Sequence, residues 1–222
     1  MTDQDAPNQV IATILARRSV RFGYSERQVS ESDLQLIVAA GLAAPSSKNA
    51  RPWRLHVVTS REKLDAIASA AETADDVDTY VPPDPLTGDP SPVFQSTVRE
   101  SAIALRDAPS AIALENRGVY IRDVEWLASR SPEVLARTLT AYGLETMGLG
   151  TALENMWLAA NSLGIQAAFL GDLTIASPAA RGILGLQGDL VGVLALGYSA
   201  AAPPPRLEPA PETQSESQVV WH

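Results

Sequence analysis

The spacing of apolar residues predicts helices and strands that follow one another along the chain. Helical spacing occurs in four stretches, at residues 10–18, 61–71, 94–106 and 132–163. Apolar runs rich in β-branched residues predict strands at residues 53–59, 110–114, 165–170 and 189–197. We expect these elements to form one α+β domain over residues 9–198, with a central mixed β-sheet flanked by long helices.

Local signals indicate where some helices begin and end. Ser30 is the expected N-cap of a further helix, with Asp33 three residues later, and Pro45 ends that helix. Ser177 is the expected cap of a short helix that has Pro178 in its first position. The longest predicted helix is apolar nearly all round, which is typical of a core or a subunit interface.

Irregular segments surround these elements. Residues 73–92 contain five prolines and several acidic residues, which predicts a long surface loop or lid, while residues 116–130 are expected to be irregular or helical. Residues 1–8 are expected to be a disordered leader. Residues 199–222 end in the apolar triplet Val219-Val220-Trp221, so we expect this extension to dock on a partner subunit.

Composition and charge exclude several classes of protein. With 222 residues and 45% hydrophobic residues, the chain can bury a sizeable core. No apolar run approaches the roughly 20 residues that cross a membrane, and the acidic start does not resemble a secretory signal. We therefore expect a cytoplasmic protein. The net charge of −9 argues against a nucleic-acid partner.

Several kinds of catalytic site are also excluded. The chain has no cysteine and only two histidines, His56 and His222, so we expect no metal site and no Ser-His-Asp triad. No glycine-rich fingerprint follows a predicted strand, which argues against a Rossmann dinucleotide site.

Arginines are concentrated at one point of this acidic chain. Arg17, Arg18 and Arg21 occur within five residues, together with Ser19. The planar guanidinium group donates paired hydrogen bonds to phosphate, so the cluster is a candidate phosphate site. The ordinary alternative is that these cations cap the end of a helix.

Two further motifs follow the arginine cluster. The first is Ala44-Pro45-Ser46-Ser47-Lys48-Asn49-Ala50-Arg51-Pro52-Trp53, a turn of small polar residues between prolines, whose alternative is an ordinary helix-to-strand loop. The second is a helical run, Glu154-Asn155-Met156-Trp157-Leu158-Ala159-Ala160, that precedes a predicted strand.

In this order, and with the closing run Val191-Gly-Val-Leu-Ala-Leu-Gly-Tyr198, the motifs resemble the nitroreductase family of FMN-dependent enzymes. The resemblance extends from Ile14 to about Tyr198. It implies a nitroreductase-like, domain-swapped type of homodimer with two FMN molecules at the subunit interface. Each FMN would then be held by residues of both subunits.

The resemblance also implies roles for individual residues. Arg17 would contact the FMN phosphate, Arg18 and Ser19 the ribityl chain and ring edge, and Arg21 the N1–C2=O edge, where it would stabilise reduced flavin. The residues expected to reach the flavin of the other subunit are Pro45, Ser46, Ser47 and Asn49. The backbone of Leu170 and Gly171 would pack on one face of the ring.

The sequence departs from the family pattern at two positions. Arg51 stands where the family usually has glutamine, which adds a cation near the cofactor or the interface. The family tail tends to carry two basic residues that complete the phosphate site, and here only Arg206 is present.

The function implied is an oxidoreductase in which NAD(P)H reduces FMN and an electron-poor small molecule then takes the electrons. Such acceptors are nitroaromatics, quinones or activated alkenes, used in a ping-pong cycle. Two alternatives stay open: a flavin-dependent dehydrogenase or oxidase of a biosynthetic intermediate, and a non-catalytic flavin-binding protein. Specificity would be set by residues 73–99 and 116–130. No general acid or base is assigned.

Overall fold

The computed structural model describes residues 8–199 and Pro205. Four strands form one antiparallel sheet in the order β1-β2-β4-β3. They are β1 (Trp53–Val58), β2 (Ser110–Asn116), β3 (Gln166–Leu170) and β4 (Asp189–Gly197). The four predicted strands are thus confirmed. The strand pairs are all antiparallel, so the sheet is not mixed as predicted, and the parallel pairing of Ser19 with Ala167 is an isolated bridge beside it.

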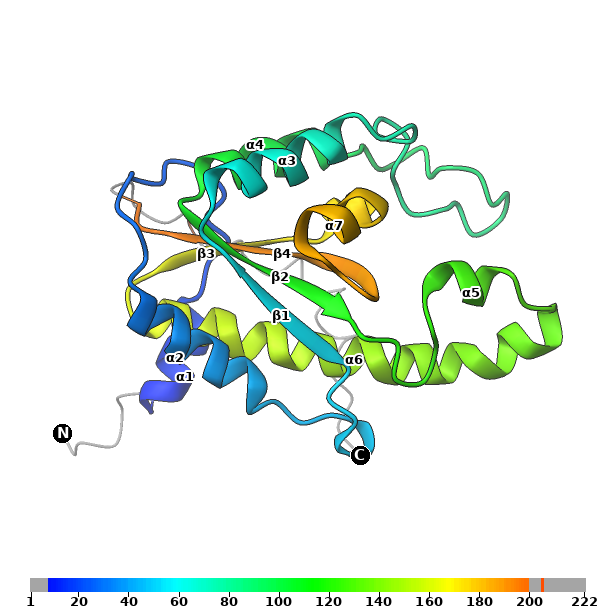
Figure 1. Ribbon diagram of the computed structural model, residues 1–222, viewed down its shortest axis with the longest axis horizontal. Coiled ribbons are helices and arrows are strands. Elements are labelled where there is room, and N and C mark those ends of the chain that lie inside the picture. The colour runs from blue at the N-terminus through cyan, green and yellow to red at the C-terminus, as the bar shows by residue number, and fades with distance from the viewer. Residues whose placement is uncertain (1–7, 200–204, 206–222) are drawn as a thin grey trace, which may run out of the picture.

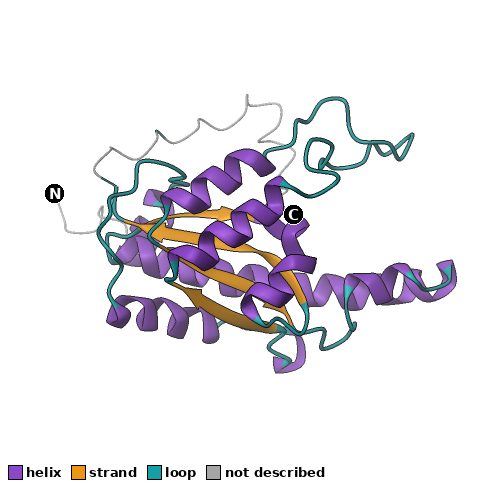
Figure 2. Cartoon of the chain, turned by 45° about the horizontal axis from the view of Figure 1, so that its top comes forward, coloured by secondary structure: helices purple, strands orange, loops and turns teal. Residues whose placement is uncertain are grey.

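Helices cover both faces of this sheet (Figure 1, Figure 2). One face carries α3 (Arg61–Glu72), α4 (Val98–Asp107), the 3-10 helix η2 (Gly171–Ala176) and α7 (Ser177–Leu184). The other face carries α2 (Glu31–Leu42) and α6 (Pro132–Ser162), with α1 (Gln9–Ala16) packed on α6. The short helices η1 (Ser47–Asn49) and α5 (Val124–Ala128) lie in connections.

Both faces of the sheet are buried, and their side chains differ in size. Along β2, Ala111 and Ala113 face the α3–α4 side, while Ile112 and Leu114 face α2 and α6. This alternation follows from the two-residue period of a strand. The prediction of a central sheet flanked by long helices is therefore confirmed, and α6 is one unbroken helix that shares its face of the sheet with α2.

Two predicted helix boundaries were wrong. The helix expected from residue 94 begins at Val98, because Ser96 and Thr97 use their hydroxyls elsewhere. Ser96 Oγ donates to the Val77 carbonyl, and Thr97 Oγ1 donates to Asp172 at 2.6 Å. Ser177 is a helical residue and not the cap of α7, since its hydroxyl accepts a hydrogen bond from the Leu190 amide of β4.

Glu115 on β2 is a fully buried carboxylate that joins three parts of the chain. It lies 2.7 Å from His56 Nε2, and it accepts the amides of Gln187 and Gly188 at 3.0 and 2.8 Å. Burial acts to raise the pKa of Glu115, but these hydrogen bonds and the charge of Arg54 outweigh it and hold the pKa below its ordinary value.

This arrangement predicts an acid-sensitive contribution to stability. A depressed pKa in the folded state stabilises the protein above the unfolded pKa of about 4.3, and the effect is lost as pH falls through the lower folded value. We expect Glu115→Gln to flatten the decline in the free energy of unfolding between pH 5 and pH 3, measured by urea titration. An equally steep decline in the variant and in wild type would contradict this.

Candidate functional site

The segment that carries the arginine cluster is fixed against the sheet. It leaves the end of α1, and the Val20 amide donates to the Ala167 carbonyl at 3.0 Å, so the chain runs beside β3. Asn161 on α6 donates to the Thr13 carbonyl at 3.2 Å and anchors α1 itself. The backbone of residues 17–21 is therefore positioned by both α6 and β3.

The three arginines of this segment point to different environments. Arg18 Nη1 donates to the carbonyls of Leu15 and Arg17 at 2.9 and 2.8 Å, so Arg18 caps α1. Arg17 Nε lies 3.6 Å from Glu154 Oε1, and its guanidinium group stacks 4.3 Å from the centre of the Trp157 ring. Arg17 Nη1 is buried and has no hydrogen-bond partner within residues 8–199.

Arg21 borders a hollow of about 560 Å³ at the end of β3. The hollow is lined by Arg21, Phe22, Thr97, Glu100, Ser101, Phe169, Gly171 and Asp172. Arg21 and Gly171, which are 150 positions apart, are thus brought together as predicted site residues. Within residues 8–199, no carboxylate forms an ion pair with Arg21.

Gly171 keeps the floor of this hollow open. A Cβ atom at position 171 would lie 2.9 Å from the ring of Phe169, so any side chain here would force that ring to move. Leu170 before it is buried in the core, with 1% of its surface exposed. Because Gly171 has no Cβ, a ligand can approach its backbone closely.

A second hollow, of about 590 Å³, shares Thr97, Gly171 and Asp172 with the first. Its remaining wall comes from Tyr80, Val81, Pro82 and Pro83 of the loop predicted as a lid, and from Phe94 and Gln95 just after that loop. Burial raises the pKa of Tyr80, and the negative charge of Asp172 adds to the rise. The loop expected to set specificity therefore borders the same glycine as Arg21.

The loop containing Pro45, Ser46, Ser47 and Asn49 is held in a strained conformation. Lys48, Asn49 and Arg51 have positive φ angles of 50°, 54° and 48°, which non-glycine residues rarely adopt. Such strain persists only where the surroundings enforce it, and it is concentrated at functional sites.

Contacts from α6 and from within the loop enforce that strain. Thr151 donates to the Pro45 carbonyl at 2.9 Å, and the Ser46 hydroxyl accepts the Arg51 amide at 2.9 Å. Gly148 lets Pro52 pack on α6, because a Cβ there would lie 3.1 Å from the proline ring. Arg51 is exposed, and its Nε donates to Asn49 Oδ1 at 3.1 Å. The cation that this sequence adds to the family pattern is therefore hydrogen-bonded within the loop itself.

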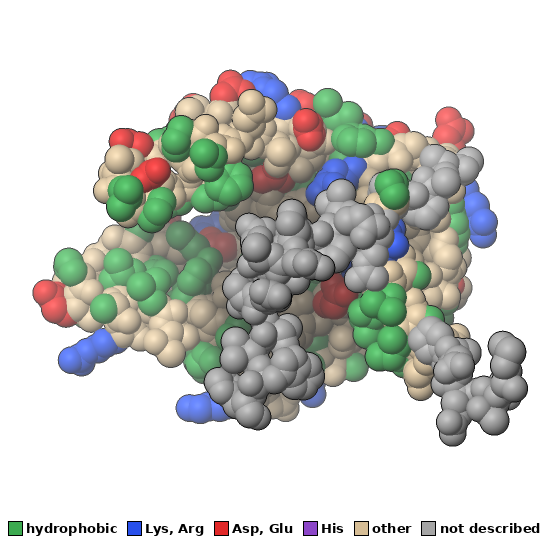
Figure 3. All heavy atoms as spheres, turned by 180° about the vertical axis from the view of Figure 1, so that it is seen from behind, with side chains coloured by type: hydrophobic (Ala, Val, Ile, Leu, Met, Phe, Trp, Pro, Cys, Tyr) green, Lys and Arg blue, Asp and Glu red, His purple; other side chains and the backbone are tan. Residues whose placement is uncertain are grey.

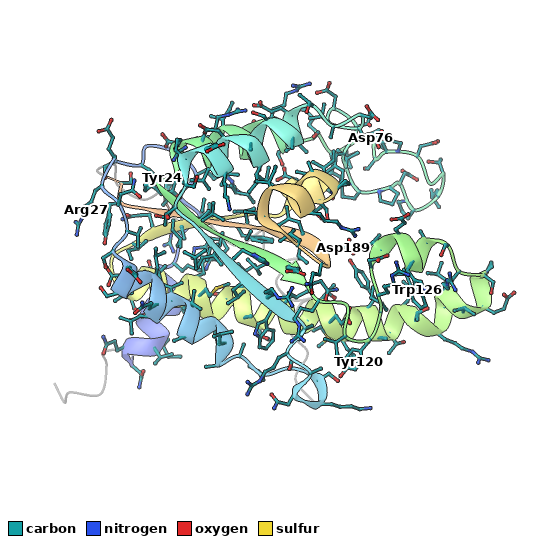
Figure 4. The ribbon with its side chains drawn as sticks, viewed as in Figure 1. Tyr24, Arg27, Asp76, Tyr120, Trp126 and Asp189 are labelled. Atoms are coloured by element: carbon teal, nitrogen blue, oxygen red, sulfur yellow. The ribbon has the colours of Figure 1, made fainter. Side chains whose placement is uncertain are left out.

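Sequence reasoning missed the residues that support this loop from the other side. The Tyr120 hydroxyl donates to the Ser47 carbonyl at 2.9 Å, and Tyr120 lies near that end of the molecule in Figure 4. Glu145 of α6 is fully buried and accepts the amides of Tyr120 and Ile121. Asn116 Nδ2 donates to the other Glu145 oxygen at 2.9 Å. The sequence feature that could have revealed this network is Glu145, a glutamate within a largely apolar stretch of the predicted helix.

Within the described residues 8–199, no residue of the 45–49 loop lines either hollow beside Gly171. Arg206 lies outside the described residues, as do the Val219–Trp221 triplet and residues 1–7 of the predicted leader, while Asn8 is the N-cap of α1. Among the side chains that are described, no group of three or more His, Asp or Glu could hold a metal ion, and no helix is long and apolar enough to cross a membrane.

Comparison with curated proteins finds local similarity. A predicted NADH dehydrogenase/NAD(P)H nitroreductase of Archaeoglobus fulgidus is 40% identical over 62 residues, which are 28% of this chain and 35% of that protein. A protein of the same name from Methanothermobacter thermautotrophicus is 40% identical over 58 residues, 26% of this chain. The match spans only about a third of these relatives' own length, 35% and 30%.

Solved structures match over nearly the whole chain. A nitroreductase with bound FMN from Bacteroides fragilis has a TM-score of 0.61 and 25% identity, covering 92% of this chain and 97% of that one. The NADPH:FMN oxidoreductase of Vibrio harveyi, complexed with NAD⁺, shares the fold, with a TM-score of 0.60 and 22% identity over 91% of this chain and 74% of that one. The model of the nitroreductase family matches residues 14–198, a range that contains the arginine segment, the strained loop and both hollows, and the chain therefore belongs to the nitroreductase family.

Proposed function

We propose that this protein is an FMN-dependent oxidoreductase that takes electrons from NAD(P)H. The observation that carries the proposal is the Arg21 guanidinium group, which has no ion pair within residues 8–199 and borders a hollow of about 560 Å³ together with Gly171. The similar Bacteroides fragilis nitroreductase has FMN bound, and the name of the Archaeoglobus fulgidus relative refers to NAD(P)H. Together they favour a redox site at this hollow.

The side chains present fit a flavin mononucleotide. The buried, unpartnered Arg17 Nη1 suits an anionic phosphate, and Gly171 leaves its backbone open to a flat ring. Bound FMN would supply the acceptance and release of a hydride, while the protein supplies binding, orientation and electrostatics. Arg21 would stabilise negative charge on the ring edge, and the 73–92 loop would limit access of water.

We further infer that a second copy of the chain completes the site. The 45–49 loop lies apart from Arg21, so it would serve the cofactor held by the partner's arginine segment. Apolar residues exposed on α6 support an interface: Val134, Leu139, Leu144 and Met147, the last with 69% of its surface exposed. A monomer would hold half of each site.

Small electron-poor molecules, such as nitroaromatics, quinones or activated alkenes, are the proposed acceptors. The donor and the acceptor would use the same ring face in turn, in a ping-pong cycle. The second hollow, beneath the 73–92 loop, offers room for either of them next to Gly171. Tyr80 and Phe94 would contribute aromatic surface there.

Purified protein is expected to be yellow and to release FMN rather than FAD. Under anaerobic conditions NADH or NADPH should bleach the flavin absorbance near 450 nm, and a quinone or nitroaromatic should restore it. Bleaching by neither nicotinamide would argue against the reductase direction. Colourless protein that takes up no added FMN would overturn the proposed function altogether.

A further inference from the structure

Two buried hydrogen-bond donors without partners occur in one stack of side chains. In the part of the chain that the structure describes, four buried side-chain atoms lack a partner: Arg17 Nη1, Ser110 Oγ, Trp157 Nε1 and Arg181 Nε. Arg17 and Trp157 are in direct contact, with the guanidinium carbon 4.3 Å from the ring centre. A buried donor left unpaired loses the hydrogen bonds that it would make with water, so two such donors in contact require an explanation.

The two other arginines of this segment have different surroundings from Arg17. Arg18 donates to the carbonyls of Leu15 and Arg17, and Arg21 borders the hollow beside Gly171. Arg17 shares its charge with Glu154, whose carboxylate lies 3.6 Å from Nε and is about half exposed. This ion pair leaves Arg17 Nη1 as the unoccupied donor.

We propose that the indole N–H of Trp157 is a second ligand, beside Arg17 Nη1, of the phosphate group of the bound FMN. This inference rests on the proposed function. Indole nitrogen can only donate, and a hydrogen bond to a charged oxygen is roughly twice as strong as one between neutral groups. A neutral donor adds affinity for phosphate where Glu154 already offsets the arginine charge. Trp157 thus has two roles, as the surface on which Arg17 stacks and as a ligand.

Trp157→Phe separates these roles, because phenylalanine keeps an aromatic face under Arg17 and removes the N–H. Dissociation constants of FMN and riboflavin for the apoprotein are measured by quenching of flavin fluorescence. We expect FMN to bind about 10- to 100-fold more weakly in the variant. Riboflavin lacks the phosphate, so its affinity should stay within about twofold of wild type.

Trp126→Phe is the matched control, since Trp126 also stacks with an arginine, Arg130, at 4.8 Å, but lies on α5, away from the arginine segment in sequence (Figure 4). It should bind both flavins as wild type does. A second measurement uses the wild-type protein: the indole ¹⁵N–H resonance of Trp157 should shift with FMN and not with riboflavin.

Three results would overturn the inference. Unchanged FMN affinity in Trp157→Phe would remove the ligand, and an equal loss of FMN and riboflavin would assign Trp157 a packing role. An indole resonance that shifts equally with both flavins would also contradict contact with phosphate. Wild-type protein that binds neither flavin would instead refute the proposed function, and the inference with it.

Discussion

Glu145→Leu is expected to lower the free energy of unfolding by about 3–5 kcal/mol, because it leaves several buried donors without an acceptor. The two Glu145 oxygens accept the amides of Tyr120 and Ile121 and the side-chain amide of Asn116. Leucine fills a similar volume, so the loss isolates the hydrogen bonds from the packing. Urea unfolding followed by circular dichroism measures it.

Glu145→Gln tests the same network more finely. Asn116 already accepts the Gly118 amide on Oδ1 at 3.1 Å, which fixes its Nδ2 toward Glu145. A glutamine would present an NH₂ group to one of these donors, so we expect a loss of about 1–2 kcal/mol. Glu62→Leu, on the exposed surface of α3, should change stability by about 0.5 kcal/mol or less. If Glu145→Leu is as stable as Glu62→Leu, the hydrogen bonds to Glu145 do not contribute to the free energy of unfolding as proposed.

The buried glutamate connects stability with the proposed site. It holds the backbone at Tyr120, and the Tyr120 hydroxyl holds the Ser47 carbonyl in the strained loop. A weakened network would therefore release the loop that we propose to reach the partner's cofactor. The α5 helix and the first half of α6 project beyond the sheet (Figure 1), and this network ties their base to the core.

Exposed apolar side chains occur on that projecting part and on the 73–92 loop opposite it. From behind, Figure 3 shows hydrophobic side chains on both, facing each other across a hollowed surface. Leu86 at the tip of the loop is 94% exposed, and Met147 on α6 is 69% exposed. Isolated exposed apolar residues are ordinary, but their concentration around the proposed site fits its completion by a second copy.

Strong periodicity made the long elements predictable from the sequence. The last strand was predicted at both of its ends, since its nearly continuous apolar run is buried on both faces of the sheet. The end of α6 also followed from its sequence: Gly164 adopts a φ of 73°, and the Ile165 amide donates to the Ala160 carbonyl.

Polar residues in buried places explain where prediction failed. β2 was expected to end at Leu114, but it continues through Glu115 and Asn116, whose polar side chains are satisfied by distant residues. Likewise, Ser177 was expected to cap its own helix, but in the fold its hydroxyl accepts the amide of Leu190 on β4. Local patterns carry no information about partners that lie far away in the sequence.

The same limit applies to the candidate site. The resemblance could assign Arg21, which lies in the arginine motif, and Gly171, which matches the family's strand end, and the structure brings both to one hollow. It could not reveal that Trp157 lies beneath Arg17, since no spacing rule connects positions 140 residues apart. The roles of Ser19, Asn49 and the other predicted ligands remain predictions to be tested by mutation.

Arg21→Ala is expected to slow reduction of bound FMN by NAD(P)H about 100-fold, the typical loss when one charge-stabilising group is removed from a reaction centre. Arg21 has no ion pair within the described part of the chain, so its removal should not unfold the protein. Anaerobic stopped-flow absorbance of the flavin gives the rate, at saturating nicotinamide.

Two further variants assign this loss to the charge of Arg21. Arg21→Lys keeps a cation but lacks the planar guanidinium fork, so we expect an intermediate rate. Arg27→Ala removes an exposed arginine that stacks 3.8 Å from the Tyr198 ring, at the edge of the molecule in Figure 4, and should reduce FMN at the wild-type rate. If Arg21→Ala also lies within twofold of wild type, the stabilising charge must come from another residue, and the hollow beside Gly171 loses its proposed electrostatic role.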